Sequence, residues 1–335
     1  MKKTLTLMLC LLMVLGMLCA CNGNSNETEP ETSATVPPEE ENVLKVLTIG
    51  HSLAVDCGHM LALVADAEGY DGLQVGTLYY SGCSLEFHVK FMKQNSPVYS
   101  LYLSSTDKPN EPPIIMSSVT MQQAITYDYW DIFVMQGGVF EIGADLTYKN
   151  GNIQKIQEFV NQNKLDPDAT FAWHMPWATP IDNELRDMYS EDDNPYYREY
   201  ARYYNKRNKF YEAITKCVKE NILTDETFEF MIPSGTALEN ALSSYLEEKD
   251  IHRDYAHASN FSRVIASYTW YCKLAGIDKL DELKLDVVPK QFLRGDAANA
   301  DWTLTQHEKD LILESVNNAL AEPLKMTQSQ YTVAP

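Results

Sequence analysis

Ser52, Asp254 and His257 are the residues of this chain whose types and order could perform nucleophilic catalysis. A serine hydroxyl becomes a useful nucleophile only when a base removes its proton, and an imidazole base needs a partner that fixes its tautomer. His257 can be that base, and Asp254 can orient it. The order Ser…Asp…His is one of several that reach the same geometry in unrelated proteins. The three residues therefore predict a Ser-His-Asp mechanism.

Each part of this pattern has a simpler explanation when it is taken alone. A lone serine after a strand often only caps the next helix. An Asp and a His three residues apart often are solvated neighbours on a helix. The prediction of catalysis therefore depends on the combination and on where the chain places it.

Ser52 lies in the stretch VLKVLTIGHSLAVD, which runs from Val43 to Asp56. Val43–Ile49 is apolar and rich in β-branched residues, which is typical of a strand buried on both faces. Gly50 ends that pattern, and from Asp56 the apolar residues recur with a helical period. Ser52 therefore lies on a strand-to-helix turn, where the following N–H groups can receive an anion.

The same alternation of short apolar strands with helices continues along the chain. It predicts a three-layer α/β/α sandwich around a parallel sheet of about five strands. The expected strands are Val43–Ile49, Leu73–Tyr80, Trp130–Met135, Thr170–His174 and Thr227–Pro233, with a small hairpin at Val98–Ser105. Helices are expected from Asp56, at Leu85–Lys93, Thr120–Tyr127, Ile153–Gln162, Phe261–Leu274, and from a cap at Thr305 to about Leu320. A long helix is expected to begin at Pro195.

Ligands bind beyond the carboxyl ends of the strands in such sheets. Those ends carry Ser52, Gly82, Gln136, His174 and Ser234. We expect the backbone N–H groups of Ser52 and Gly82 and the side-chain amide of Gln136 to stabilise an oxyanion. His174, Trp177 and Ser234 are expected to line the substrate pocket, although a buried core histidine explains His174 equally well.

The first twenty residues have the pattern of a signal peptide. Lys2 and Lys3 precede the apolar run Leu5–Leu18, and Leu18-Cys19-Ala20-Cys21 resembles a bacterial lipobox. The resemblance implies cleavage before Cys21 and lipidation of its thiol, so we expect an extracytoplasmic protein anchored to a membrane by lipid alone. The alternative is an ordinary signal peptide in which Cys21 is incidental.

Composition separates four segments. Residues 1–20 are the signal peptide, 21–42 a lipidated cysteine and polar tether, 43–325 one large domain, and 326–335 a C-terminal tail. Without Lys2 and Lys3, the 27 basic residues become 25 against 47 acidic ones, a formal charge of −22. That charge argues against nucleic acid as a partner. Neither the cysteines nor the histidines show metal-ligand spacing, and no cofactor is expected. Cys57, Cys83, Cys217 and Cys272 are expected to be buried free thiols.

The chain resembles an SGNH (GDSL-like) hydrolase, of a little-characterised bacterial branch. The resembling segments are IGHSLAVD at 49–56, YYSGCSLE at 79–86, WDIFVMQGG at 130–138, HMPWA at 174–178, IPSGTALENA at 232–241 and RDYAH at 253–257. The resemblance implies a flavodoxin-like fold, Ser52 as nucleophile, Gly82 as oxyanion donor, and Asp254 with His257 as the acid–base pair. Two residues depart from the pattern: His51 replaces the usual Asp or Asn, and Gln136 the usual Asn.

These observations favour a serine esterase that removes small acyl groups, most simply acetyl, from carbohydrate. Tyr196–Tyr204, Trp173 and Trp177 could present flat faces to sugar rings, or the tyrosines could pack against the sheet. The alternatives are a non-catalytic glycan-binding lipoprotein, a lipase-like esterase, and a structural or adhesion lipoprotein.

The lipobox resemblance generates a prediction about anchoring. Cys21→Ser should abolish incorporation of labelled fatty acid, because the serine hydroxyl cannot replace the thiol that is modified. Radiolabelled palmitate and membrane fractionation would measure this. Labelling that persists in the variant would exclude an anchor at Cys21.

Overall fold

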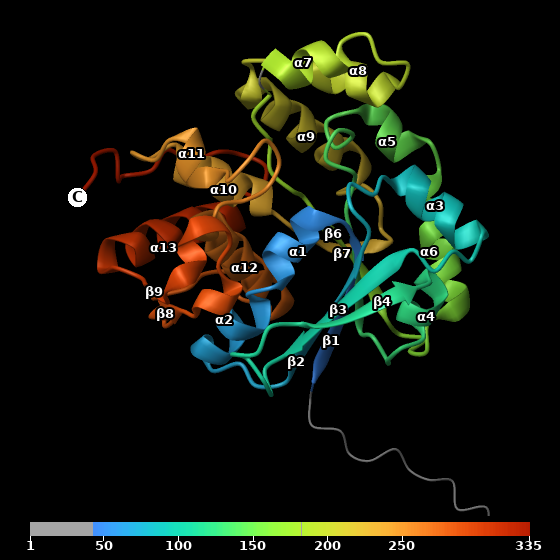
Figure 1. Cartoon of the computed structure of the whole chain (residues 1–335), viewed down its shortest axis with the longest axis horizontal. Helices are drawn as coiled ribbons and strands as arrows, with labels where there is room; N and C mark the ends of the chain where they lie inside the picture. Colours follow the sequence, from blue (N-terminus) through green and yellow to red (C-terminus); the bar gives the residue numbers. More distant parts are fainter. Residues whose placement is uncertain (1–42, 182) are drawn as a thin grey trace, which may run out of the picture. The chain divides into compact units, whose positions relative to one another are not determined.

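A computed structural model describes residues 43–181 and 183–335 (Figure 1). The expected signal peptide, Cys21 and tether lie outside these residues. No helix in the part described is long and apolar enough to cross a membrane.

The centre of the domain is a seven-stranded sheet in the order β4-β3-β2-β1-β5-β6-β7. Its strands are β1 (Leu44–Gly50), β2 (Leu73–Tyr79), β3 (Tyr99–Ser105), β4 (Ile114–Val119), β5 (Ile132–Met135), β6 (Thr170–His174) and β7 (Phe228–Ile232). The pairs β1–β2, β1–β5, β5–β6 and β6–β7 are parallel, whereas β3 and β4 are antiparallel. The five expected strands are therefore the parallel ones. The hairpin expected at Val98–Ser105 is wrong, because this segment is one continuous strand, β3, which pairs with β2 on one side and β4 on the other.

The parallel part of the sheet is buried on both faces, whereas the edge strand β4 is largely exposed. Side chains of successive β1 residues point to opposite faces, so Val46 belongs to one apolar core and Leu47 to the other. Helices cover each face in Figure 1, including α2 (Leu61–Glu68), α12 (Asn260–Leu274) and α13 (Gln306–Ala321) on one side. The other side carries α3 (Leu85–Lys93), α6 (Asn152–Asn163) and α9 (Arg207–Asn221). The three-layer α/β/α prediction is confirmed.

The remaining helices are short and connect these layers. They are α1 (Ser52–Gly58), α4 (Met121–Ile125), α5 (Asp145–Lys149), α7 (Asn183–Tyr189), α8 (Pro195–Ala201), α10 (Ser234–Leu242) and α11 (Glu248–Ile251). A two-stranded ribbon pairs β8 (Val287–Val288) with β9 (Trp302–Thr303), and two 3₁₀ turns, η1 (Lys290–Phe292) and η2 (Gly295–Asn299), lie between them.

The long helix expected from Pro195 is wrong, because it is broken after Ala201. Asn205 has a φ of 53°, in the left-handed region that a helix cannot include, and α9 begins only at Arg207. The expected cap of the last helix is confirmed, since the Thr305 hydroxyl accepts from the Glu308 N–H. Residues of the expected C-terminal tail pack on the domain, where the Tyr331 carbonyl accepts from the Tyr245 N–H.

The close approach of two strand ends generates a prediction about stability. Gly235 donates its N–H to the Met175 carbonyl, and a Cβ there would lie 2.3 Å from the Pro176 carbonyl oxygen. Gly235→Ala should therefore lower the free energy of unfolding by about 1–3 kcal/mol, the usual cost of overpacking. Urea unfolding would measure this. Gly58→Ala is the matched control, because its Cβ would meet side-chain atoms only, the Thr77 Oγ1 at 3.0 Å and the Val75 Cγ1 at 3.9 Å. Equal losses in the two variants would contradict the explanation.

Candidate active site

His51 holds the turn between β1 and α1 in place. Its Nδ1 accepts from the Leu53 N–H at 3.4 Å, so its Nε2 carries the proton and donates to the Gly137 carbonyl at 3.0 Å. Complete burial lowers the pKa of His51 to about 4, which keeps the ring neutral at neutral pH. The residue that departs from the usual Asp or Asn thus caps α1 and ties the serine turn to the end of β5.

The structure brings Ser52, His257 and Asp254 together, although 205 residues separate the serine from the histidine. His257 Nε2 lies 2.8 Å from the Ser52 Oγ. Its Nδ1 lies 2.8 and 2.9 Å from the two carboxylate oxygens of Asp254. With the proton on Nδ1, the Ser52 hydroxyl donates to Nε2, which is the arrangement that general-base catalysis needs.

Asp254 is prepared to stay ionised. Burial acts to raise its pKa, but the N–H groups of Ala256 and His257, each donating at 2.8 Å, and the His257 ring outweigh that effect. The pKa of Asp254 therefore lies below its ordinary value. The same two N–H bonds fold residues 254–257 into a tight turn that fixes the histidine relative to its carboxylate.

Asp56 ties this turn to the helix of the serine, and the sequence reasoning did not identify it. Asp56 lies one helical turn after Ser52 on α1, and its carboxylate accepts from Arg253 at 2.8 Å and from the Ala258 N–H at 3.1 Å. The buried Arg263 lies 3.5 Å from the same carboxylate. These contacts bracket the Asp254–His257 turn on both sides. The sequence feature that could have indicated this contact is the positively charged Arg253 next to Asp254, because a buried carboxylate needs a cationic partner.

Two backbone N–H groups are free to stabilise an oxyanion. Within the part of the chain that the structure describes, neither the Ser52 N–H nor the Gly82 N–H has a hydrogen-bond acceptor. Gly82 has a φ of +59°, and its exposed backbone faces open space. Both expected backbone donors are therefore without an acceptor among the residues described.

Gln136, by contrast, requires a correction. Its side chain is 1% exposed and its Oε1 accepts from His174 Nδ1 at 2.8 Å. Its Nε2 has no partner among the residues described, but it is buried, and it lies 2.7 Å from where a Gly50 Cβ would be. A substrate oxygen cannot reach an amide that is shielded in this way. Gln136 turns inward to the neighbouring strand β6 and is not an oxyanion donor in this structure.

The three residues expected to line the substrate pocket are also buried. His174, Trp177 and Ser234 have no exposed surface. Burial lowers the pKa of His174 to about 3, its Nε2 lies 3.7 Å from the Cys57 Sγ, and its ring packs on Trp270. The alternative of a core histidine is therefore the correct one. Trp177 instead holds the turn that carries His257, because its Nε1 donates to the Ala256 carbonyl at 2.9 Å.

The aromatic surface expected for sugars is largely internal. Trp173 is fully buried, and Tyr196 and Tyr200 are also buried, so these tyrosines pack against the domain as the alternative held. Tyr197 remains partly exposed. The four cysteines named above are buried free thiols.

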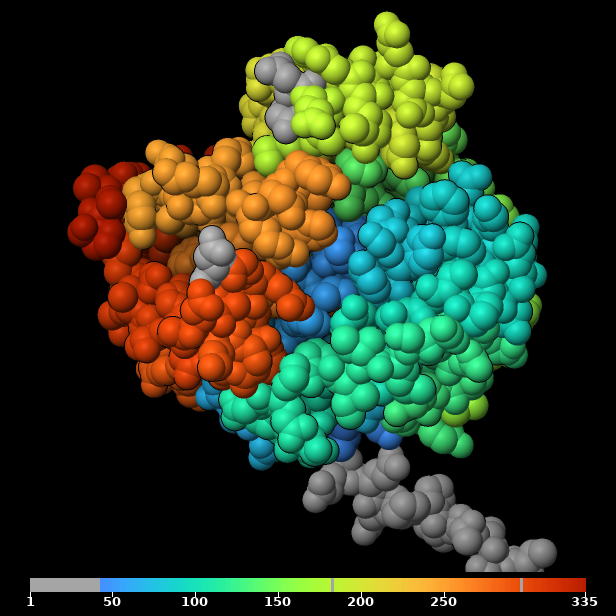
Figure 2. All heavy atoms as spheres, in the orientation of Figure 1, coloured from blue at the N-terminus to red at the C-terminus, as the bar shows by residue number. Residues whose placement is uncertain are grey.

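A pocket that the sequence did not predict adjoins Gly82. Its volume is 120 Å³, and it lies between the β2–α3 turn, the segment after β5 and the start of α8. Its lining includes Glu86, Phe140, Glu141 and Tyr197. Burial raises the pKa of Glu141 to about 7, and the charge of Glu86 adds to this effect. In Figure 2 the α3 region (cyan) and the region of the 253–260 segment (orange) border a hollow, with the blue β1–α1 region between them.

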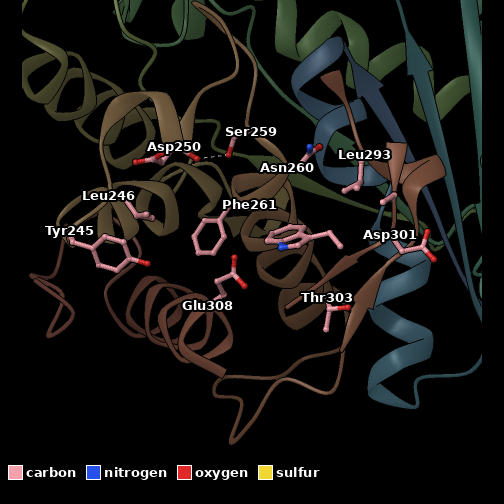
Figure 3. Close-up of a pocket in the computed structure, with 12 residues that line it drawn as sticks. Tyr245, Leu246, Asp250, Ser259, Asn260, Phe261, Leu293, Asp301, Thr303 and Glu308 are labelled. Atoms are coloured by element: carbon pink, nitrogen blue, oxygen red, sulfur yellow. Dashed lines mark hydrogen bonds between the residues drawn. The ribbon is translucent and has the colours of Figure 1, made fainter. Parts of the chain in front are cut away.

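A larger cavity of 530 Å³ lies elsewhere (Figure 3). It is lined by residues of α11, α12, β9 and α13, among them Tyr245, Phe261, Trp302 and Glu308, and does not include Ser52. Glu308 and Asp250 in its wall are already engaged as helix caps. The smaller pocket, by contrast, shares Gly82 with the expected oxyanion site.

Comparisons with known proteins agree with this fold. Residues 45–292 match the family described as "Domain of unknown function (DUF4886)". A crystal structure of a DUF4886 family protein from Bacteroides uniformis ATCC 8492 has a TM-score of 0.66 and 22% identity, and the match covers 86% of this chain and 98% of that one. At that identity the likeness establishes the fold alone. No curated protein matches the chain.

The matches also include a structure described as "a putative SGNH hydrolase from Slackia heliotrinireducens". Its TM-score is 0.41 at 13% identity, and the match covers 69% of this chain and 98% of that one. A likeness at this identity and TM-score does not establish a superfamily for this chain. No argument about activity rests on so distant a likeness.

The buried His174 generates a prediction about pH. An unfolded histidine has a pKa of about 6.5. The folded value is about 3, so protonation favours the unfolded state. Stability should fall as the pH drops from about 6.5 toward about 3. His174→Gln should flatten the slope of unfolding free energy between pH 6 and 4 by up to about 1.4 kcal/mol per pH unit. Urea unfolding at several pH values would measure this; parallel curves for the two proteins would contradict it.

Proposed function

We propose that this chain, which belongs to the DUF4886 domain family, is a serine ester hydrolase that acts through Ser52. The family's description assigns no activity, so the proposal rests on the site. The single observation that carries it is the hydrogen-bonded series from the Ser52 Oγ to His257 Nε2 at 2.8 Å and from His257 Nδ1 to Asp254. Ser52 is not the cap of α1, because the His51 side chain accepts the hydrogen bond from the Leu53 N–H. Its hydroxyl contacts His257 instead.

The reaction follows from these contacts. His257 takes the proton of Ser52 as the Oγ attacks the ester carbonyl, and the N–H groups of Ser52 and Gly82 stabilise the oxyanion. The protonated imidazole, stabilised by Asp254, then gives its proton to the departing alcohol oxygen. Water, activated by the same histidine, releases the acyl group from Ser52 as a carboxylic acid. His51 is neutral and buried, so it takes no part in these proton transfers.

A small acyl group on a carbohydrate is the substrate that these features favour. The pocket beside Gly82 has a volume of 120 Å³, which suits a short acyl group or one edge of a sugar ring better than a fatty chain. Its walls combine aromatic rings with carboxylates, which are groups that pack on sugar rings and accept hydrogen bonds from hydroxyls. The formal charge of the chain, −20, disfavours polyanionic substrates.

The proposal extends to location. A lipid anchor at Cys21, followed by a tether to residue 42, would hold this domain outside the cytoplasmic membrane, where polysaccharides are the abundant acylated polymers. The support for this is the lipobox resemblance alone, and the anchoring experiment above tests it independently of the activity.

The triad generates a prediction about activity. The protein should hydrolyse p-nitrophenyl acetate, and Ser52→Ala should lower turnover on the order of 10⁴-fold or more, because the nucleophile is lost. Asp254→Asn should also slow turnover strongly while leaving the fold intact, since the wrong tautomer of His257 is then favoured. Ser117→Ala, an exposed serine on β4, is the matched control.

Two further measurements test the substrate: the dependence of turnover on acyl chain length, and acetate release from a glycan. Turnover should decline from acetate to octanoate esters, and acetate should be released from O-acetylated glycans. Wild-type rates in Ser52→Ala would remove this serine from the mechanism. A clear preference for octanoate, with no acetate from any glycan, would replace the proposal by a lipase-like activity.

A further inference from the structure

We propose that the pocket beside Gly82 holds the sugar side of the ester and selects a sugar that carries a protonated amine. We call it the acidic–aromatic pocket and define it by Gly82, Glu86, Phe140, Glu141 and Tyr197. The inference rests on the proposed function, because it assigns to this pocket the part of the substrate beyond the ester bond.

The position of the pocket connects it to the reacting atoms. Gly82 forms part of its wall and supplies one of the two free oxyanion donors. Gly138, also in the wall, approaches the opposite side so closely that a Cβ would lie 3.1 Å from the Ser84 Cα and 3.3 Å from the Glu141 Oε2. A group bound here therefore lies against the backbone of Gly82, which in the proposed mechanism donates to the oxyanion.

The pocket offers an aromatic face. The rings of Phe140 and Tyr197 meet edge to face, with centroids 5.2 Å apart, and a third ring, that of Tyr189, packs 4.8 Å from Tyr197. Such a cluster is rigid, and its faces attract both the C–H edges of a sugar and a cation. A ligand that presents an ammonium group on a sugar ring uses both properties.

The charge of the pocket is uncompensated. Glu86 and Glu141 line it, and no Lys or Arg is among the residues described there. The Glu141 side chain is 7% exposed, and its carboxylate accepts hydrogen bonds from Ser84, Leu85 and Gly138 but has no cationic partner in the pocket lining. Its raised pKa, about 7, agrees with a carboxyl that lacks a cationic partner. An ammonium group would supply that partner, whereas a neutral sugar would not and a uronate would be repelled.

The groups around Glu141 do not supply a cation from another element. The titratable groups that face it are Cys83 and Glu86 of the β2–α3 region, Tyr148 of α5, and Tyr196 and Tyr197 of α8. All of these are neutral or acidic. The Ser84 hydroxyl and the N–H groups of Leu85 and Gly138 donate hydrogen bonds to the Glu141 carboxylate, but none of these donors carries a positive charge.

Calorimetric titration of the purified protein with three monosaccharides at pH 7.5, above the pKa of Glu141, tests the inference. D-Glucosamine should bind at least 10-fold more tightly than N-acetyl-D-glucosamine, and D-glucuronate should bind most weakly. Glu141→Gln should remove the preference for glucosamine, and Glu86→Gln should reduce it. Glu282→Gln makes the same change of charge at an exposed position outside the pocket and should leave the preference unchanged.

Two results would overturn the inference: equal binding of glucosamine and N-acetylglucosamine, or a preference that survives in both pocket variants. Glu86 is exposed, so Glu86→Gln keeps the test decisive even if Glu141→Gln does not fold. Ester hydrolysis through Ser52 without any amine preference would leave the esterase standing and remove this inference. If glucosamine binding depends on Glu141 but the protein hydrolyses no ester, the selectivity of the pocket stands and the proposed esterase function is removed.

Discussion

The candidate site depends on one buried carboxylate, that of Asp56. It is 2% exposed and accepts from Arg253 and from the backbone of Ala258, with the fully buried Arg263 beside it. A buried charge is costly unless it is paired and hydrogen-bonded, so this cluster tolerates few arrangements of the chain. Because Asp56 shares α1 with Ser52, the arrangement that satisfies the carboxylate also brings the segment of His257 to the nucleophile. Burial lowers the pKa of Arg263 only to about 10, so its positive charge persists at neutral pH.

Behind this charged cluster lies a second network, and it is neutral. His51 hydrogen-bonds the Gly137 carbonyl and so holds the serine turn. His174 hydrogen-bonds Gln136 through one ring nitrogen and contacts the Cys57 thiol through the other. Burial holds both imidazoles unprotonated and raises the pKa of the Cys57 thiol, so these groups act as fixed hydrogen-bonding partners. The site thus combines a charged cluster, which positions the histidine, with an uncharged network, which positions the serine.

The sequence was most informative where a local pattern determines the structure. The five parallel strands, the turn at Ser52 and the cap at Thr305 follow from periodicity and turn chemistry, and the residues of the triad follow from their types and order. The direction of a side chain at a strand end was not predictable, because it depends on neighbours distant in sequence. Gln136 turns inward only because His174 lies on the next strand and Gly50 leaves room. Glu141 carries no sequence pattern that distinguishes it from a solvated glutamate. Its burial is set by packing between segments that are far apart in the chain.

The long separation along the chain between Ser52 and its base has a consequence for the order of events in folding. The serine is linked to His257 across 205 residues, and Asp56 to Arg253 across 197. Contacts of such high sequence separation form late, because the chain must first lose the entropy of closing the loop. During synthesis Ser52 emerges, and its strand can pair, before His257 has been made. Under the proposed mechanism the chain therefore has no esterase activity until its last third has docked, because only then does the serine have a base.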